Sequence, residues 1–181
     1  MKNGEVLKKK RQQGGKVMKD SELRMIETML KKQDELNLAI MKEYGLTTIS
    51  KEQIDLSTLD EIGEFTHELK GDWCWWKKTQ APVDKESVLE ELIDVLHFAL
   101  SYENQYGLST HVTYKEQIQF EKKHISVYGF ASVLADLIER GDGLVERTIA
   151  IGESLGFTIE QVYSAYCDKN KVNYQRLKEG Y

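Results

Sequence analysis

The chain has 181 residues, of which 40% are hydrophobic and 30% charged, with a formal net charge of −5 at pH 7. This mixture predicts one soluble globular domain, and an acidic chain lacks the broad basic surface of a nucleic-acid groove binder. No apolar run approaches the roughly 20 residues that span a bilayer. Cys74 and Cys167 lie far apart and the basic start has no signal-peptide core, so we expect free thiols and a cytoplasmic protein.

Residues 1–19 are rich in Lys, Gln and Gly and show no sustained apolar period. Gly14 and Gly15 would break a helix there. We therefore predict a flexible basic tail at 1–19 and a single domain at 20–181.

The first helix is expected from Asp20 or Ser21 to Gly45, between an N-cap and a C′ residue type. Its apolar stripe follows steps of three and four residues, but Gln33 and Asn37 occupy two positions of that stripe. A buried amide needs hydrogen-bond partners. Either these amides bond to a neighbouring helix, or they line a pocket and read the edge of a polar planar ligand.

The second helix is predicted to begin at Ser57 or Thr58, where Thr58 and Glu61 match a capping box. Its apolar side would comprise Leu59, Ile62, Phe65 and Leu69. Glu61, Glu64 and Glu68 share another face, which is either a solvated charge stripe or part of a site. After Gly71, an aromatic and basic segment follows that suits either core packing or a stacked base and its phosphates: Trp73, Trp75, Trp76, Lys77 and Lys78.

The third helix follows Pro82 and Asp84, with Ser87 and Glu90 as a further capping-box candidate, and ends at Gly107. It is apolar around most of its circumference, which is typical of a central helix in a bundle. Glu91 and Asp94 interrupt that surface. Acids on such a helix are seldom buried unless they are paired or bind metal.

Three further helices are expected, at about Tyr114–Arg140, Leu144–Leu155 and Thr158–Lys178, and no stretch alternates for long enough to predict a strand. The fold class is therefore an all-α bundle of about six helices. Lys169, Asn173 and Arg176 share one face of the last helix. They either offset the helix dipole or form an oxyanion clamp.

Taken together, these pieces fit one chemistry. Glu61, Glu64, Glu91 and Asp94 would form an oxygen-rich site for Mg²⁺ or Mn²⁺, shared with substrate phosphates. Lys77, Lys169 and Arg176 would neutralise charge on a polyphosphate, while Gln33, Asn37 and an aromatic residue would hold a base. The pattern favours metal-assisted hydrolysis of a nucleotide.

The Glu-x-x-Glu and Glu-x-x-Asp pairs around an aromatic-Lys segment resemble the all-α nucleotide pyrophosphohydrolase superfamily, which includes MazG-type enzymes. The run from Tyr166 through Lys169, Asn170, Asn173 and Arg176 to Gly180-Tyr181 narrows the resemblance to the dimeric all-α dUTPases. It covers most of the chain after about Asp20. Either acid pair alone would be a weak signal.

The resemblance implies hydrolysis of dUTP to dUMP and pyrophosphate, and also action on dUDP, by a homodimer. The acidic charge and the lack of a long apolar run predict no nucleic-acid or membrane partner. Glu61, Glu64, Glu91 and Asp94 would be the Mg²⁺ ligands, for more than one ion when substrate is bound, and Glu64 or Glu61 would orient or deprotonate the water. The other implied roles fall into two groups. Phosphates would meet Lys77, Lys169, Asn173 and Arg176, and the base and sugar would meet Gln33, Asn37, Trp76, His97 and Phe98.

Three alternatives stay open at this point. A carboxylate-bridged di-iron bundle could use the pairs Glu64-x-x-His67 and Glu121-x-x-His124 with Glu27 and Glu91. A non-catalytic helical scaffold would bind no Mg²⁺ through Glu91 or Asp94. A related pyrophosphohydrolase could act on dCTP or a broader set of nucleotides, because an amide can reverse its donor and acceptor.

Overall fold

The computed structural model describes residues 18–69, 74–107, 118 and 143–180, and the regular structure within them is helical. In chain order the helices are α2 (Asp20–Glu43), α3 (Lys51–Leu69), α4 (Lys85–Tyr106), α7 (Leu144–Ser154) and α8 (Ile159–Glu179). The predicted all-α fold is confirmed. None of the described helices is long and apolar enough to cross a membrane.

Two sequence-based expectations fall largely outside the described residues. The helix expected at Tyr114–Arg140 is described only at Ile118, which is buried. The expected tail at 1–19 is described only at its end, where Met18 is buried in the core and Lys19 is the N-cap of α2. The boundary between tail and domain stays a prediction.

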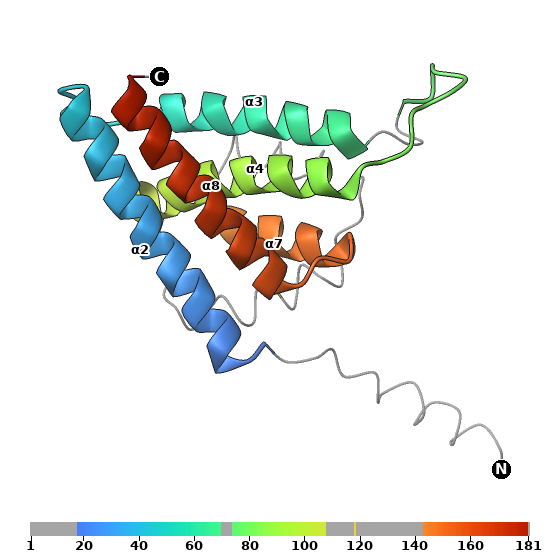
Figure 1. The fold of residues 1–181 in the computed structure, drawn as a ribbon, viewed down its shortest axis with the longest axis horizontal. Helices are drawn as coiled ribbons and strands as arrows, with labels where there is room; N and C mark the ends of the chain where they lie inside the picture. The colour runs from blue at the N-terminus through green and yellow to red at the C-terminus, as the bar shows by residue number, and fades with distance from the viewer. Residues whose placement is uncertain (1–17, 70–73, 108–117, 119–142, 181) are drawn as a thin grey trace, which may run out of the picture.

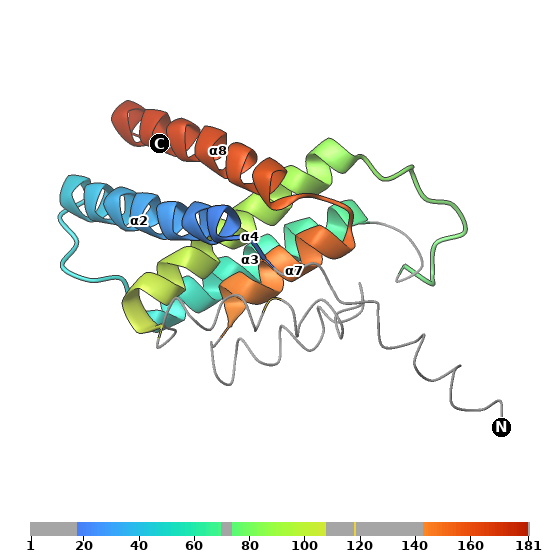
Figure 2. The ribbon, with the colours of Figure 1, turned by 90° about the horizontal axis from the view of Figure 1, so that it is seen from below.

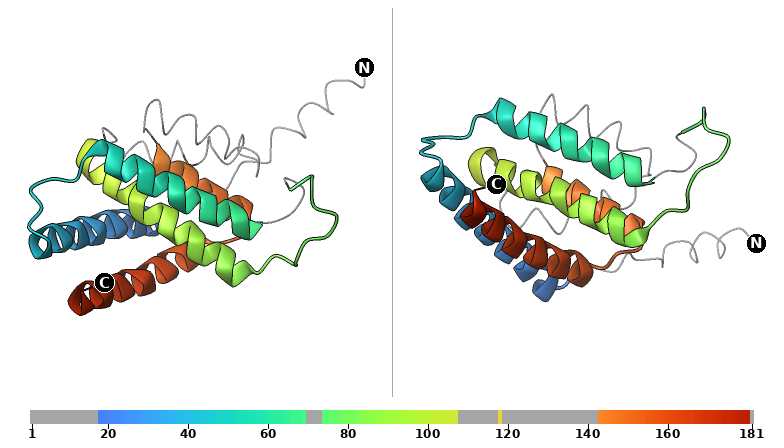
Figure 3. Two further views of the ribbon diagram at one scale, coloured as in Figure 1. Left: turned by 90° about the horizontal axis from the view of Figure 1, so that it is seen from above. Right: turned by 45° about the horizontal axis from the view of Figure 1, so that its top comes forward.

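Helix α4 lies at the centre of the bundle, where it packs against α2, α3, α7 and α8 (Figure 1). Its apolar side chains, among them Leu92, Leu96 and Leu100, are almost completely buried, as the all-round apolar pattern predicts. Helix α3 lies beside α4 and runs in the opposite direction (Figure 3). Helices α2 and α8 pack together on another side of α4 and lead toward the same end of the bundle (Figure 2).

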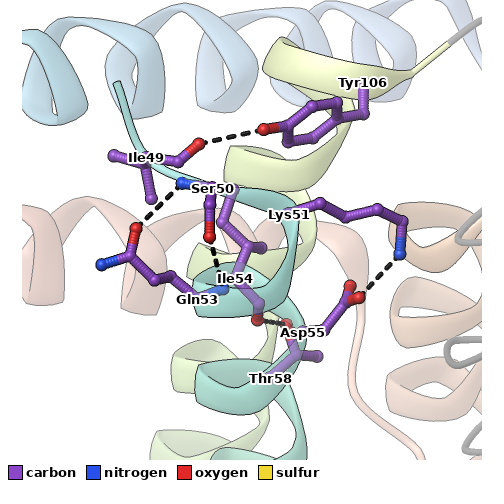
Figure 4. Close-up of polar contacts among 8 residues, drawn as sticks. All are labelled: Ile49, Ser50, Lys51, Gln53, Ile54, Asp55, Thr58 and Tyr106. Atoms are coloured by element: carbon purple, nitrogen blue, oxygen red, sulfur yellow. Dashed lines mark hydrogen bonds and ion pairs between the residues drawn. The ribbon is translucent and has the colours of Figure 1, made fainter. Parts of the chain in front are cut away.

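The predicted start of the second helix at Ser57 or Thr58 is wrong, because α3 begins at Lys51 (Figure 4). Thr58 is fully buried, and its hydroxyl donates to the carbonyl of Ile54 at 2.7 Å, one turn back within the helix. The true capping box is Ser50 with Gln53: Ser50 N donates to Gln53 Oε1 at 2.9 Å, and Gln53 N donates to Ser50 Oγ at 3.2 Å. Two Ser/Thr-x-x-Glu/Gln patterns therefore compete in this stretch, and the first one forms the cap.

The earlier start changes which apolar residues of α3 are buried. Ile62, Phe65 and Leu69 are in the core as predicted, whereas Leu59 is 44% exposed. Ile54 and Thr58 complete the inner stripe instead, since steps of four, four, three and four residues keep the five on one face.

The other helix ends mostly follow the sequence. Asp84, not Ser87, caps α4: its carboxylate accepts from Glu86 N at 3.0 Å and from the Ser87 hydroxyl at 3.3 Å. Helix α8 begins as the sequence predicts, and Thr158 and Gln161 form a capping box at its start. Gly45 follows α2 with a φ of 65°, a left-handed conformation that suits glycine.

Candidate functional site

Three carboxylates converge where α3 and α4 pack side by side. Glu61 and Glu64 of α3 and Glu91 of α4 each place an oxygen within 4.8 Å of the other two. One oxygen of Glu91, Oε2, is buried and has no hydrogen-bond partner in the described structure. The cluster borders a cleft of about 450 Å³ that Glu64 and Glu91 line together with Asp60, Gly63, His67 and Glu68.

The acids in this cluster are held in an unfavourable electrostatic state. Burial, followed by the negative charges of Asp94 and Glu64, raises the pKa of Glu61 to about 7. Burial and the charge of Asp94 likewise raise the pKa of Glu91. Carboxylates that repel one another and lack partners are stabilised when a cation joins them.

These residues fit a hard divalent cation. Such a cation takes oxygen ligands, and three oxygens on two rigid helices, one of them unpartnered, supply a partial coordination shell that leaves room for water and phosphate.

Asp94, the fourth predicted ligand, has a different partner in the structure. Its Oδ2 accepts a hydrogen bond from Lys169 Nζ of α8 at 2.6 Å, and the same ammonium lies 3.4 Å from Glu90 Oε1. Burial raises the pKa of Asp94 and outweighs the hydrogen bond and charge of Lys169, which lower it. Lys169 therefore links the last helix to the acid cluster.

The two predicted amides form a buried network about one turn further along α4. Gln33 Nε2 donates to Asn37 Oδ1 at 2.9 Å and to Ser101 Oγ at 3.1 Å, and Asn37 Nδ2 also donates to Ser101 Oγ. The Tyr166 hydroxyl donates to Gln33 Oε1 at 3.0 Å. Gln33 and Asn37 thus bond to neighbouring helices, the first of the two alternatives, and their contact with a ligand stays a prediction.

The network determines the protonation of His97. Its Nδ1 lies 2.6 Å from Gln33 Oε1, and because that oxygen only accepts, Nδ1 carries the hydrogen. Burial, helped by the charge of Lys169, lowers the pKa of His97 to about 3, so the ring is neutral and Nε2 is an acceptor. His97 also stacks on Tyr166 with ring centroids 4.5 Å apart, and Nε2 is buried without a partner in the described structure.

The remaining predicted residues are partly buried or exposed. Trp76 is 57% exposed and Lys77 is exposed. Both belong to residues 74–84, which precede α4 and project beyond its end (Figures 1 and 2). Phe98 is partly buried on α4, and Asn173 is partly buried on α8. Arg176 is exposed, but its positive charge reaches Asp94 and lowers the pKa of that carboxyl.

Sequence reasoning missed Ser101 and the role of Tyr166 in the network. A signal existed for Ser101: His97 and Ser101 are four residues apart on α4, as Gln33 and Asn37 are on α2. Matching polar pairs on two apolar helices predict a contact between those helices. Tyr166 gave no comparable signal, because a tyrosine on an apolar stripe is ordinary.

An all-α bundle with a carboxylate cluster between two helices is an arrangement that can hold a divalent metal ion. A family model described as dUTPase matches residues 25–181, and the chain belongs to that family. The predicted all-α dUTPase family is confirmed, and the protein is an enzyme, a dUTP diphosphatase. No curated protein matches the chain.

Membership in the family closes two of the alternatives. A non-catalytic scaffold and a di-iron bundle are both inconsistent with a dUTPase. In the described part of the chain the group of side chains that could hold a metal also contains neither His67 nor Glu27. Glu121 and His124 lie outside the described residues. dUTPases need a divalent metal, and the three converging carboxylates are a group that can hold it.

Proposed function

We propose that the protein hydrolyses dUTP, and also dUDP, to dUMP, with Mg²⁺ bound by Glu61, Glu64, Glu91 and Asp94. The observation that carries this proposal is the convergence of three carboxylate oxygens from α3 and α4 beside an open cleft, with Glu91 Oε2 buried and unpartnered. A bound divalent ion would polarise the phosphate and lower the pKa of a coordinated water. More than one ion would be held once substrate phosphates complete the shell.

The residues around the cleft would position the reactants. Glu64 is exposed and lines the cleft, so it is our candidate to orient the attacking water and accept its proton, with Glu61 beside it as the alternative. Lys169 would stabilise charge developing on the phosphates, together with Asn173 and Arg176 of the same helix face. Lys77 would approach from the segment between α3 and α4.

Helix α4 supports a consistent orientation of the nucleotide. Glu91, Asp94, His97 and Ser101 follow one another in steps of three, three and four residues, which keeps them on one side of the helix over about 15 Å. In this arrangement the phosphates would lie beside Glu91 and Asp94. The base would lie beside His97 and Ser101, which contact Gln33 and Asn37 of α2. Trp76 and Phe98 would complete the wall around base and sugar.

His97 supports uracil over cytosine. Its neutral ring has Nε2 as a buried, unpartnered acceptor, because Nδ1–H is committed to Gln33, and a base that reached this atom would have to donate to it. The N3 position of uracil is a donor, whereas that of cytosine is an acceptor and would leave two lone pairs facing each other. An enzyme that acts on dCTP would need a hydrogen-bond donor at this position. An enzyme that acts on many bases would need a position that does not distinguish donors from acceptors.

The test is pyrophosphate release from dUTP, dCTP, dTTP and UTP, with and without Mg²⁺. We expect Mg²⁺-dependent preference for dUTP, and a loss of activity on the order of 10²–10³-fold in Glu64→Gln and in Asp94→Asn. Glu52→Gln, an exposed change on the same helix as Glu64, is the matched control and should keep full activity. Equal activity on all four nucleotides would leave the metal site standing and move the function to a broad pyrophosphohydrolase.

We further propose a cytoplasmic homodimer. Support for the dimer comes from α3, where Leu56 and Leu59 are 67% and 44% exposed beside a shallow depression that shares Asp60 and Gly63 with the acidic cleft. Support for the location comes from the two cysteines, both free. Light scattering after size exclusion tests the dimer: Leu56→Glu should yield monomers, and Leu38→Glu, an equally apolar exposed site on α2, should not.

A further inference from the structure

Lys169 and Asp94 form a close ion pair between α8 and α4 at the edge of the acid cluster. The 2.6 Å contact is short, and the two side chains are only 14% and 18% exposed. A charge-assisted hydrogen bond of this length in a partly desolvated place is stronger than an exposed surface pair. Glu90, 65% exposed, lies 3.4 Å away and adds to the attraction.

Asp94 also interacts electrostatically with the cluster formed by Glu61, Glu64 and Glu91. Its negative charge acts on both Glu61 and Glu91, which are close enough to respond to it. A divalent cation held by the cluster would attract Asp94 and repel the Lys169 ammonium. The cation and the ammonium therefore draw on the same carboxylate, and each weakens the binding of the other because two positive charges held at one carboxylate repel.

We propose that Lys169 is an internal counter-ion that competes with the divalent cation for Asp94, and that nucleotide phosphates relieve this competition by attracting the ammonium away. The inference rests on the proposed metal and phosphate roles of this site. A lysine suits the exchange because its charge sits at the end of a flexible four-carbon stem. Cation affinity is low while Lys169 holds Asp94 and rises when phosphate engages Lys169, so substrate and metal bind with positive coupling.

The first experiment measures Mn²⁺ binding to the nucleotide-free protein by calorimetry or electron paramagnetic resonance. Lys169→Gln should bind Mn²⁺ about fivefold more tightly than the wild type, at the lower end of typical coupling between two ligands. Lys171→Gln is the matched control: it makes the same charge change on the same helix, where Lys171 pairs with Asp168 and is 76% exposed. It should change the affinity by less than about twofold.

A double-mutant cycle shows whether the effect passes through Asp94. In an Asp94→Asn background, Lys169→Gln should no longer raise the affinity for Mn²⁺, because the carboxylate that both cations share is gone. Lys169→Arg keeps the charge and the pairing with Asp94, so it should not raise the affinity for Mn²⁺. If Lys169→Gln fails to fold, a raised affinity in Lys169→Arg would still contradict the counter-ion role. An unchanged or weaker affinity in Lys169→Gln, or a gain equal to that of Lys171→Gln, overturns the counter-ion role.

Nucleotide supplies the second arm. With a saturating α,β-imido analogue of dUTP, the wild type should gain more Mn²⁺ affinity than Lys169→Gln, since the variant has no competing ammonium to release. An equal gain in both proteins overturns the coupling. Failure of the proposed function looks different: the affinity for Mn²⁺ would then be the same in Glu64→Gln as in the wild type, whatever happens at Lys169.

Discussion

Two polar regions lie one after the other along α4, and they differ in how completely their polar groups are paired. The acid cluster around Glu61 and Glu91 is open to a cleft and holds a carboxylate oxygen without a partner in the described part of the chain. The amide network around Gln33 and Ser101 is buried, and its amides are joined to one another and to two other helices. The network stabilises the fold, whereas the cluster strains it and is explained by the cation that it would bind.

The largest expected effect is a separation of activity from stability at the acid cluster. Glu91→Gln should lower kcat/KM for dUTP on the order of 10²–10³-fold, because it removes a metal ligand. The same change removes charge repulsion within the cluster. In protein freed of metal by a chelator, the melting temperature of the variant should therefore be equal to that of the wild type or higher. Glu86→Gln, an exposed change near the start of α4, is the control. A strong loss of stability in Glu91→Gln would mean that this acid has a structural partner.

The amide network should respond in the opposite way. Gln33→Leu keeps roughly the volume but removes the hydrogen bonds that Gln33 makes with His97, Tyr166 and Asn37, at a cost of about 2 kcal/mol in the free energy of unfolding. Urea denaturation monitored by circular dichroism measures this cost. Asp34→Leu, on the exposed side of α2, should change it by less than about 0.5 kcal/mol. If both variants were equally stable, the network would not hold the helices together.

In protein freed of metal by a chelator, the two regions should change the free energy of unfolding in opposite directions as the pH rises. The pKa of Glu61 is raised from 4.5 to about 7, so the folded state binds more protons than the unfolded state in that window, and Glu61 lowers stability as pH rises. The pKa of His97 is lowered from 6.5 to about 3, so the unfolded state binds more protons there, and His97 raises stability as pH rises toward 6.5.

Variants separate the two contributions. Between about pH 4.5 and 6.5, Glu61→Gln should make stability rise more steeply with pH, and His97→Gln should make it rise less steeply or fall. We expect changes of slope of about 1 kcal/mol per pH unit for the buried histidine and less for the partly exposed Glu61. Thermal melts across this range measure both slopes. Changes of the same sign in the two variants would contradict the assignment of the shifts.

Much of the fold is readable from the sequence because it depends on local patterns. The apolar circumference of α4 predicts its central place, and the capping box of Thr158 and Gln161 predicts the start of α8. The start of α3 is easily misread because Ser50 and Thr58 both carry cap-like patterns. Local sequence offers both positions, and the burial of Thr58 against the rest of the bundle selects the first.

The candidate site divides in the same manner. The sequence alone indicates Glu61, Glu64 and Glu91 as site residues, because acids on a nearly apolar helix follow acids on the helix before it. Burying a charge is costly wherever the residue lies, so this signal does not depend on the tertiary structure. The partners of the polar groups are not readable in this way. That Lys169 meets Asp94, and that Gln33 sets the tautomer of His97, depends on how α2, α4 and α8 cross. Contacts between residues so far apart in the chain are decided by helix packing, which only the tertiary structure supplies.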